Sequence, residues 1–369
     1  MKILIITYTF LPDLGGAESV AYSYADLLVD MGFDVTVVSK RYENPIKNTK
    51  FKYLQVPDCK FVKYLWMSNF RKYLNRMDLN EYDVIILNES VMPAIVGKIF
   101  DNEILKKSIP IIQGVEVEWI YKNKKIISRI FHSLIRLEYY HKKCLLDCRK
   151  IVSVSEFHKQ KVIDAARLDS IRDKFEVVYT GIEKNVFYPA LSSFREDNDL
   201  KNKEVLVSVS RIRKMKGYLE MLSVFKRVVE RDSSFRWVII GDGPYLEELK
   251  RQVQINRLSE YIIFLGGKTR EELKYYYSMA DCFWLLSNYD ECLPLVYLEA
   301  QACGIPAIGR NKGGTRETIR NNETGFLVDT EEECVRLILN RSYKNISKKA
   351  IKEFVDLFDE WEAAKKLIQ

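Results

Sequence analysis

Short apolar runs alternate with stretches of helix length along the first half of the chain. One such stretch is Ala17–Met31. The apolar runs are rich in β-branched residues and nearly continuous, a pattern typical of parallel strands that helices cover on both faces. The predicted strands are Ile3–Ile6, Val35–Val38, Val84–Leu87, Ile109–Ile112 and Ile151–Val154.

A polar stretch from Leu191 to Glu204 interrupts this pattern, which then restarts. The pattern predicts an α/β protein with two Rossmann-like, doubly wound domains, residues 1–190 and 191–345. Because open α/β sheets bind ligands at the carboxyl ends of their strands, we expect a ligand in a deep crevice between the domains. The strands predicted for the second domain are Val205–Val209, Trp237–Ile240, Ile262–Leu265, Cys282–Leu286 and Ile305–Ile308.

The chain ends in helical segments that carry large apolar side chains. These side chains need a surface to pack against, and we expect a C-terminal helix at 346–369 that packs back on the first domain. The side chains concerned are Phe354, Leu357, Phe358 and Trp361.

Length and composition fit this organisation. A chain of 369 residues exceeds the roughly 150 residues of one typical domain. The opening MKILIITYTF has too short an apolar run for a signal peptide or a membrane span, and it is expected to be a buried strand. Seven cysteines without framework spacing predict reduced thiols in a cytoplasmic protein.

The net charge of +7 is unevenly distributed. Residues 45–76 carry eight Lys or Arg against one acid, and residues 104–150 carry eleven against four. Aromatic residues interleave with the first of these segments, a composition that suits the inner face of an anionic membrane, although a solvated or partly buried face has the same composition. No nucleic-acid recognition motif accompanies the charge, so nucleic acid is not expected as a partner.

Two groups of residues have spacings that suit a metal. His141, Cys144 and Cys148 lie at helical spacing without a fourth ligand, and Asp197 and Asp199 lie in the polar linker. Metal sites need more ligands than either group offers, so no metal is expected at either place.

Glu291 and Glu299 are eight positions apart, with Pro294 between them and Gly304 after them. Proline favours the first position of a helix and glycine the position after its end, which predicts a helix at about Pro294–Cys303. A helix start binds anions, and a carboxylate pair beside it suits sugar hydroxyls. The segment therefore predicts a ligand with phosphate and sugar parts, and a solvated acidic helix start is the alternative.

Two further loops suit the same ligand. Gly15 and Gly16 precede a helix and expose N–H donors without forming the GxGxxG pattern of dinucleotide sites. Arg211 and Lys216 flank a loop that opens a helix near Gly217, and such a pair can neutralise a diphosphate. An ordinary tight turn and a solvated basic loop are the alternatives.

The order of these motifs resembles that of the retaining glycosyltransferases of family 4, which have the GT-B fold. The matching segments are LPDLGGAES, SVSEFHKQ, VVYTGIEKNVFYP, SVSRIRKMKG, GDGPYLEEL, FLGGKTREELKYYYSMADCF, ECLPLVYLE followed by QACGIPAIG, and GGTRETIRNNETGFLV. The resemblance implies retaining hexosyl transfer from a nucleoside diphosphate sugar, with a UDP-sugar favoured and no metal. The basic first domain suggests a lipid-linked or growing saccharide acceptor, as in bacterial lipopolysaccharide or capsule synthesis.

The resemblance also implies roles for individual residues. Glu299 is expected to hold the ribose, Glu291 the donor sugar, and Arg211 with Lys216 the diphosphate. Gln113 stands where many members have a histidine that contacts the donor sugar, and it cannot titrate. The expected donor site also includes Gly15, Gly16, Lys268, Leu293, Pro294 and Leu295.

Two more positions depart from the family pattern, Thr180 in place of Asn and Cys292 in place of Gly. A side chain at 292 restricts the backbone and is expected to reshape the sugar pocket. Two other functions fit the same fold: an accessory subunit that binds a nucleotide sugar without turnover, and an epimerase or phosphorylase.

Overall fold

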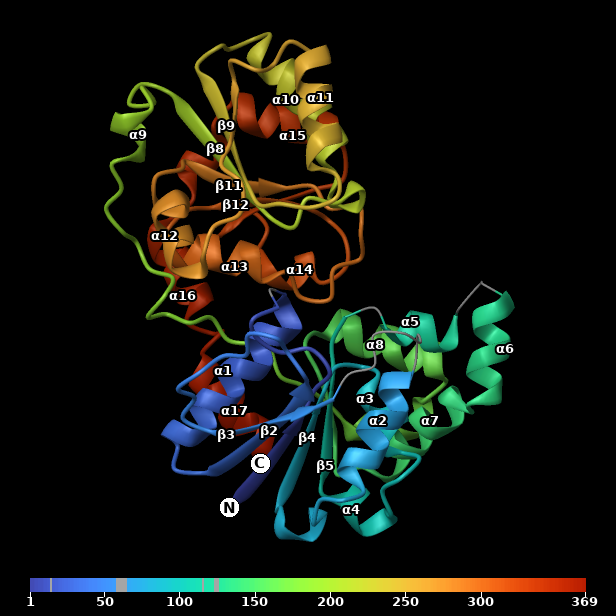
Figure 1. Ribbon diagram of the computed structural model, residues 1–369. Helices are drawn as coiled ribbons and strands as arrows, with labels where there is room; N and C mark the ends of the chain where they lie inside the picture. The colour runs from blue at the N-terminus through green and yellow to red at the C-terminus, as the bar shows by residue number, and fades with distance from the viewer. Residues whose placement is uncertain (14, 58–64, 115, 123–125) are drawn as a thin grey trace. The chain divides into compact units, whose positions relative to one another are not determined.

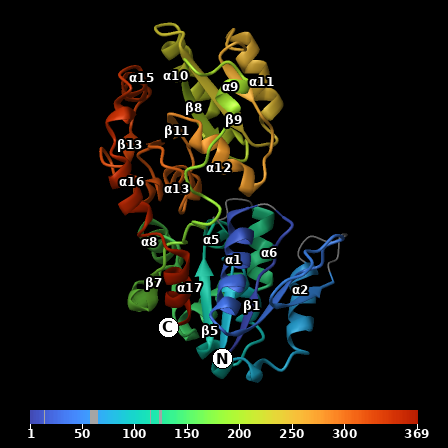
Figure 2. The ribbon, with the colours of Figure 1, turned by 90° about the vertical axis from the view of Figure 1, so that its left-hand side faces the viewer.

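The computed structural model describes residues 1–13, 15–57, 65–114, 116–122 and 126–369 (Figure 1). The chain forms two compact units. The first consists of Met1–Thr180 with Trp361–Gln369, and the second of Gly181–Glu360. Each unit is a parallel sheet with helices on both faces (Figures 1 and 2). The prediction of an α/β protein with two Rossmann-like domains is confirmed.

The first unit has a seven-stranded sheet in the order β3-β2-β1-β4-β5-β6-β7. The strand order reverses at β1, which pairs with β2 on one side and β4 on the other. Ligands of such sheets bind beside the carboxyl ends of the strands at this switch point. The strands are β1 (Lys2–Ile6), β2 (Asp34–Lys40), β3 (Lys52–Val56), β4 (Val84–Asn88), β5 (Ser108–Ile112), β6 (Ile151–Ser153) and β7 (Phe175–Val177).

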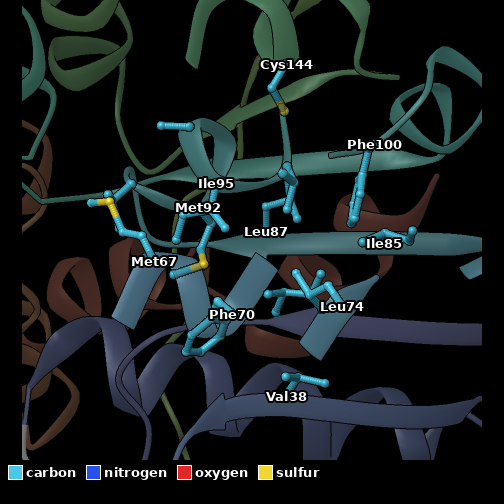
Figure 3. Packing of buried hydrophobic residues seen from close by; sticks show 14 of the residues in the cluster. Val38, Met67, Phe70, Leu74, Ile85, Leu87, Met92, Ile95, Phe100 and Cys144 are labelled. Carbon is cyan, nitrogen blue, oxygen red and sulfur yellow. The ribbon is translucent and has the colours of Figure 1, made fainter. Parts of the chain in front are cut away.

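The helices of the first unit bury a continuous apolar cluster against this sheet. Figure 3 shows Phe70 and Leu74 beneath Leu87 and Ile85 of β4, with Met92 close by. The helices are α1 (Gly16–Asp30), α2 (Leu65–Leu74), α3 (Met92–Val96), α4 (Asn102–Lys106), α5 (Glu116–Tyr121), α6 (Ile126–Leu134), α7 (Leu137–Asp147), α8 (Glu156–Ala166) and α17 (Glu360–Ile368), with the short turns η1 (Leu79–Glu81) and η2 (Asp169–Lys174).

The second unit has a six-stranded sheet in the order β10-β9-β8-β11-β12-β13, with its switch point between β8 and β11. In its core Trp237 of β9 packs against Trp284 of β11, with ring centroids 4.8 Å apart and the ring planes tilted by 58°. The strands are β8 (Glu204–Val209), β9 (Phe235–Ile240), β10 (Ile262–Phe264), β11 (Cys282–Leu285), β12 (Ala307–Arg310) and β13 (Gly325–Val328). The helices are α9 (Phe194–Asp197), α10 (Tyr218–Val229), α11 (Leu246–Ile255), α12 (Arg270–Ser278), α13 (Leu295–Ala302), α14 (Thr315–Thr318), α15 (Glu331–Leu339) and α16 (Lys348–Val355), with η3 (Lys214–Lys216) and η4 (Ser342–Asn345).

The boundary between the units differs from the predicted position at 190. Residues 181–190 belong to the second unit because their backbone is bonded there. The N–H of Ile182 donates to the carbonyl of Phe358 at 2.9 Å, and that of Ala190 donates to Ser278 Oγ at 2.9 Å. The polar stretch at 191–204, which was predicted to link the domains, is an exposed segment within the second unit.

The C-terminal segment is two helices, not one. Helix α16 belongs to the second unit, and only Trp361–Gln369 joins the first, where Lys150 Nζ donates to the carbonyl of Lys366 at 2.6 Å. The prediction that all four large side chains are buried is wrong for two of them. Phe354 and Phe358 are buried, whereas Leu357 is 63% exposed and Trp361 is 41% exposed. Among the residues that the structure describes, no helix is long and apolar enough to cross a membrane.

Candidate functional site

Lys216 and Glu291 meet at the switch point of the second sheet. The Nζ atom of Lys216 lies 2.5 Å from Glu291 Oε1. Ser287, in the loop that follows β11, donates from its Oγ to the same oxygen at 2.9 Å. The side chains of Lys216 and Glu291 are only 20% and 12% exposed, so this ion pair is partly shielded from water. Such an arrangement holds a cation and a carboxylate in fixed positions at the edge of the sheet.

Two glycines allow the loops around this pair to approach closely. Gly217 has φ +76°, and a Cβ there would lie 1.9 Å from the carbonyl oxygen of Leu286. A Cβ on Gly314 would lie 2.0 Å from the carbonyl oxygen of Cys292. The N–H of Gly314 also donates to the carbonyl of Glu291 at 2.8 Å. The position of Glu291 therefore depends on backbone contacts that only glycine permits.

Helix α13 begins immediately after this loop. Its N-cap is Pro294 and its last helical residue is Ala302, one residue inside the predicted bounds at each end. Gly304, beyond its C-terminus, has φ +84°, the conformation for which glycine was expected. The first turn carries no acidic residue. The N–H groups of the helix start therefore lie one short loop after Glu291, with Leu293 and Leu295 on either side of Pro294.

Glu299 lies within α13 and does not contact the Lys216–Glu291 pair. Its side chain is buried, and Oε2 accepts a hydrogen bond from the Tyr277 hydroxyl at 3.0 Å. Burial raises the pKa of the Glu299 carboxyl, and the Arg270 guanidinium and the Tyr277 hydroxyl oppose this effect. Arg270 Nη1 lies 3.9 Å from Glu299 Oε1, and Arg270 Nη2 lies 3.1 Å from Glu183 Oε1.

The partners of Glu299 were missed in the sequence. Arg270 and Tyr277 both come from α12, the helix that follows β10. One available signal was the position of Arg270 two residues after Lys268, which was expected in the donor site. A cation at the start of a helix cannot be assigned to a carboxylate 29 positions away without the fold.

The other predicted residues of the second unit lie at the same edge of its sheet. Arg211 follows β8 and is exposed, and its guanidinium donates no hydrogen bond within the described part of the chain. Lys268 follows β10 and places its Nζ 5.7 Å from the ring centroid of Tyr276. The structure thus joins Lys216 to Glu291 directly, while Arg211, Lys268 and Glu299 stand apart from that pair.

In the first unit, Gly15 and Gly16 begin α1. Gly15 is the N-cap in an extended conformation, and a Cβ there would overlap the Glu18 carboxylate. A Cβ on Gly16 would meet no atom within 4 Å. No side chain caps the helix start. The N–H groups of the first turn have no partner within the helix, and the role of Gly15 and Gly16 in binding a ligand stays a prediction.

Gln113 follows β5 and is 8% exposed. Its Nε2 donates to Asn88 Oδ1 at 2.6 Å, and Asn88 Nδ2 donates to Thr7 Oγ1 at 3.1 Å and to the carbonyl of Ala17 at 3.2 Å. Gln113, Asn88, Thr7 and Ala17 come from the ends of β5, β4 and β1 and from the start of α1. They form a polar cluster at the switch point of the first sheet.

Glu89 belongs to the same edge and was also missed. It has φ +78°, which is uncommon for a residue with a side chain. Its carboxylate accepts from the N–H of Thr9 at 2.9 Å, from the N–H of Tyr8 at 3.3 Å, and from the Thr9 hydroxyl. Glu89 therefore ties the loop after β1 to the end of β4. The sequence offers no pattern that singles out this residue.

The residues at the metal-like spacing are part of the core. His141 bonds to the Tyr121 hydroxyl at 2.7 Å and to the carbonyl of Ser90 at 2.9 Å, and burial lowers its pKa to about 4. Burial raises the pKa of the Cys148 thiol to about 12, and it also raises the pKa of the Cys144 thiol well above its ordinary value. Across the described residues, no group of three His, Cys, Asp or Glu side chains is arranged to hold a metal.

The two remaining departures from the family pattern cause no backbone strain. Cys292 is partly buried and its φ is not positive, so a side chain at this position is accommodated. Thr180 is the residue at which the chain leaves the first unit. It is 8% exposed, and its side chain is hydrogen-bonded to that of the buried Tyr24.

The aromatic residues that the structure describes in the first basic segment are buried or partly buried. Phe51 and Phe70 are buried, and the ring of Trp66 packs 4.1 Å from that of Tyr8. Phe61 and Tyr64 lie outside the described residues. Of the two interpretations left open, the partly buried face holds for the rings that the structure describes. Helix α6 carries two of the exposed apolar residues of the first unit, Ile130 at 65% and Leu134 at 79% exposure.

Comparisons with protein families match almost the whole chain in two parts. The family described as glycosyltransferase family 4 matches residues 14–186, and glycosyl transferases group 1 matches residues 192–353. These matches fall on the first and the second unit respectively.

Two curated relatives show the range of similarity. A GDP-mannose-dependent alpha-(1-6)-phosphatidylinositol monomannoside mannosyltransferase of Mycolicibacterium smegmatis is 34% identical over 158 residues, 40% of this chain and 41% of the relative. The chain therefore matches about two fifths of the length of this relative. An alpha-monoglucosyldiacylglycerol synthase of Streptococcus pneumoniae is 23% identical over 350 residues, 92% of this chain and 78% of the relative.

Solved structures show the same fold. Sucrose-phosphate synthase from Thermosynechococcus elongatus has a TM-score of 0.79 at 18% identity, over 99% of this chain and 96% of that one. Anabaena Alr3699/HepE in complex with UDP-glucose has a TM-score of 0.77 at 18% identity, over 100% and 98% of the two chains. At these identities the likeness establishes the two-domain GT-B architecture alone.

Proposed function

Since the chain belongs to the glycosyltransferases of family 4 and group 1, with the GT-B fold, we propose that it is a retaining enzyme that transfers a sugar from a nucleoside diphosphate sugar to an acceptor hydroxyl. The observation that carries this proposal is the Lys216–Glu291 pair one loop before the start of α13. A fixed cation and free helix N–H groups suit a diphosphate, and the carboxylates of Glu291 and Glu299 suit sugar and ribose hydroxyls.

The proposed chemistry begins when the bond between the anomeric carbon and the phosphate oxygen breaks. The sugar passes through an oxocarbenium-like state, and Lys216 and Arg211 stabilise the negative charge that develops on the diphosphate. Each such donor contributes roughly 3 kcal/mol by analogy with oxyanion holes. The acceptor hydroxyl then attacks from the face that the phosphate leaves, and a phosphate oxygen takes its proton. Because the attack on the same face retains the configuration, no nucleophile on the protein is needed, and Glu291, whose Oε1 is hydrogen-bonded to Lys216 and Ser287, keeps only the role of holding the sugar.

In this proposal the cationic side chains and the helix start do the work that a divalent metal does in other transferases. We propose a metal-independent reaction and a UDP-sugar as the donor. The names of two relatives support different nucleotides, since one is called GDP-mannose-dependent and another was solved with UDP-glucose.

A binding screen tests the proposal. Thermal shift measurements with UDP, GDP, ADP and their sugars identify the nucleotide, and the variants Glu299→Ala and Arg211→Ala are then compared with the unmodified chain. We expect both variants to lose affinity for the best nucleotide by roughly tenfold or more. Glu247→Ala, an exposed residue of α11, is the control. Equal affinities in all four proteins would show that the donor site is elsewhere.

We also propose that the acceptor is lipid-linked or membrane-bound, as in bacterial surface polysaccharide synthesis. The observation in favour is the exposed pair Ile130 and Leu134, one helical turn apart on α6 and flanked by the exposed cations Arg129 and Arg136. Apolar side chains among cations suit the interface of an anionic bilayer. The names of both curated relatives refer to lipid-containing acceptors, a phosphatidylinositol mannoside and a diacylglycerol.

Sedimentation with anionic vesicles tests this second part. We expect binding to weaken with added salt and to fall at least severalfold in the double variant Ile130→Ser, Leu134→Ser. Each of the two apolar side chains contributes roughly 1.5 to 3 kcal/mol when it is fully buried in the bilayer. Leu357→Ser removes a similarly exposed apolar side chain from the second unit and is the control. Equal binding by the double variant and by Leu357→Ser would show that α6 does not contact the membrane.

A further inference from the structure

The buried carboxylate of Glu299 has a cation close to it that forms no hydrogen bond with it. Glu299 is 5% exposed. Arg270 Nη1 lies 3.9 Å from Glu299 Oε1, within the range of an ion pair but too far for a hydrogen bond. At this distance the guanidinium attracts the carboxylate and leaves the lone pairs of Oε1 to another donor. The second oxygen, Oε2, already accepts from the Tyr277 hydroxyl.

Residues of the segment 181–190 hold Arg270 at this distance. Its Nη2 atom donates to Glu183 Oε1 at 3.1 Å, and its Cζ atom lies 5.1 Å from the ring centroid of the buried Phe187. A guanidinium that bonds one carboxylate and lies over an aromatic ring has little freedom to turn toward a second carboxylate. Arg270 is therefore bonded to Glu183 and only near to Glu299.

Glu183 itself lies in a well-anchored part of the second unit. The N–H of Ile182, the residue before it, donates to the carbonyl of Phe358 at 2.9 Å. Lys184, the residue after it, places its Nζ 3.1 Å from Asp356 Oδ1. Because both neighbours are bonded to another segment of the same unit, the Glu183 carboxylate is a fixed support for the guanidinium.

We propose that Arg270 and Glu183 are positioning residues for the ribose site. Arg270 keeps the buried Glu299 ionised through its charge, and Glu183 keeps Arg270 away from the oxygen that the ribose needs. This role rests on the function proposed for Glu299, to which it adds two residues that act through that carboxylate. Burial raises the pKa of the Glu299 carboxyl, and the Arg270 guanidinium opposes this effect.

The pH dependence of donor binding distinguishes positioning from a merely structural role. We would measure the dissociation constant of the best nucleoside diphosphate sugar by titration calorimetry between pH 4.5 and 8.5. The ionised carboxylate is the better acceptor for a ribose hydroxyl, so affinity should rise with pH and be half-maximal near the pKa of Glu299. A nucleotide sugar is the suitable probe because, unlike UDP or GDP, it has no terminal phosphate that titrates in this range.

Arg270→Gln should move this midpoint to higher pH. The amide removes the charge but can still donate to Glu183. An opposite charge beside a carboxyl lowers its pKa by roughly 1 to 3 units, so we expect the midpoint to rise by roughly one unit or more. Arg270→Lys keeps a positive charge and should leave the midpoint close to that of the unmodified chain. Arg251→Gln, which removes an arginine of α11 from its pair with Glu248, is the control and should not move the midpoint.

Glu183→Met tests the other part of the proposal. This variant removes the acceptor that holds Arg270, so the guanidinium is free to bond Glu299 directly. The carboxylate then stays ionised, but a ribose hydroxyl must displace the cation. We therefore expect no rise in the midpoint and a loss of affinity at pH 8.5 of roughly three- to tenfold.

Two results would overturn the proposal. One is a midpoint that does not rise in Arg270→Gln, including a loss of affinity by the same factor at every pH, which is the mark of a structural role. The other is unchanged affinity in Glu183→Met at pH 8.5. Circular dichroism at each pH checks that the variants are folded, and either variant tests the proposal without the other.

Failure of the proposed function has a different signature. If the unmodified chain binds no nucleotide sugar, or if Glu299→Ala binds it equally well, the donor site is misplaced and the role of Arg270 and Glu183 falls with it. If binding depends on Glu299 but the midpoint and the affinity do not respond as expected in the two variants, only the positioning role fails.

The other groups around Glu299 do not produce such a profile. Burial raises the pKa of Tyr277 well above its ordinary value and that of Cys303 to about 12, so both stay neutral over the measured range. The charged side chains of α16, which packs against α13, are exposed. The other partly buried charged residues on the elements packed against α13 are the same in every variant, and they are Lys274 of α12, Glu317 of α14 and Arg310 of β12.

Discussion

At the scale of single residues, the ribose-binding role proposed for Glu299 comes with a cost in stability. Burial raises the pKa of its carboxyl above the ordinary value of 4.5. A raised pKa means that the folded protein binds a proton more tightly than the unfolded chain does. The resulting stability is complete below pH 4.5 and is lost as the pH rises through the folded-state pKa.

Glu299→Gln should therefore change stability and binding in opposite directions. The amide is neutral at all pH values, so we expect a higher free energy of unfolding than that of the unmodified chain at pH 7 and little difference at pH 4. Nucleotide affinity at pH 7 should fall roughly tenfold, because a charged acceptor for the ribose is lost. Urea denaturation at both pH values measures the change in the free energy of unfolding, and a nucleotide titration measures the change in affinity. A variant that is destabilised at pH 7, or that binds nucleotide normally, would contradict the role given to Glu299.

The residue types and their order in the sequence identified the candidate site residues. They did not show which of these residues are in contact. Lys216 and Glu291 are 75 positions apart, and their contact exists only because β8 and β11 are neighbours in the sheet. Glu89 was missed because its role depends on a backbone conformation and on a loop 80 positions earlier. Whether the aromatic residues of 45–76 lie on a surface or are partly buried stayed open, because composition does not say which side of a helix faces the core.

At the scale of elements, the bounds of α13 were predictable because Pro294 and Gly304 act locally on the backbone. Strands β3, β7 and β13 were not predicted, and all three lie at the edge of a sheet. Strand β3 has the sequence KYLQV, which mixes polar and apolar residues, and β7 and β13 are only three and four residues long. Local signals thus sufficed for the central strands and for the edge strand β10, and they failed at the other three sheet edges.

The glycines at the two helix starts are expected to respond differently to substitution. Gly217→Ala forces a Cβ to within 1.9 Å of the Leu286 carbonyl at a positive φ, and we expect a loss of about 2 kcal/mol or more in stability together with weaker nucleotide binding. Gly16→Ala meets open space within a helix and should leave the free protein equally stable or up to about 1 kcal/mol more stable.

Binding distinguishes a functional from a merely structural turn at Gly16. If its helix start approaches the donor, Gly16→Ala weakens nucleotide-sugar binding while the protein remains stable. Chemical denaturation and a donor titration on the same samples measure both effects. Unchanged donor affinity in Gly16→Ala would leave Gly15 and Gly16 as an ordinary turn.

At the scale of the whole molecule, the two units should respond separately to ligand and to mutation. Leu367 of α17 is fully buried in the first unit, and Leu367→Ala should destabilise that unit by roughly 2 to 5 kcal/mol. Nucleoside diphosphate should stabilise the second unit, in proportion to the logarithm of its concentration. Differential scanning calorimetry checks whether the variant lowers one transition while ligand raises the other. A ligand that protects only the transition lowered by Leu367→Ala would place the nucleotide site in the first unit.

The order of strands and helices made the two-domain architecture predictable, because near-continuous apolar strands separated by helices leave few alternatives. The exact division was not predictable. Residues 181–190 and the break between α16 and α17 depend on packing between segments far apart in the sequence, such as Ile182 against Phe358. The polar composition of 191–204 indicates exposure, and the apolar side chains of the C-terminus indicate burial. Neither pattern says which part of the protein the segment packs against.

The central claim is that the second unit holds the diphosphate of a nucleotide sugar beside the Lys216–Glu291 pair. The most direct measurement is calorimetric titration of the best nucleotide sugar into the unmodified chain, Lys216→Met and Lys214→Met. Lys214 is an exposed lysine of the same short turn and carries the same charge. We expect Lys216→Met to weaken binding by roughly tenfold or more and Lys214→Met to change it by less than about threefold. Equal affinities for the two variants would contradict the account.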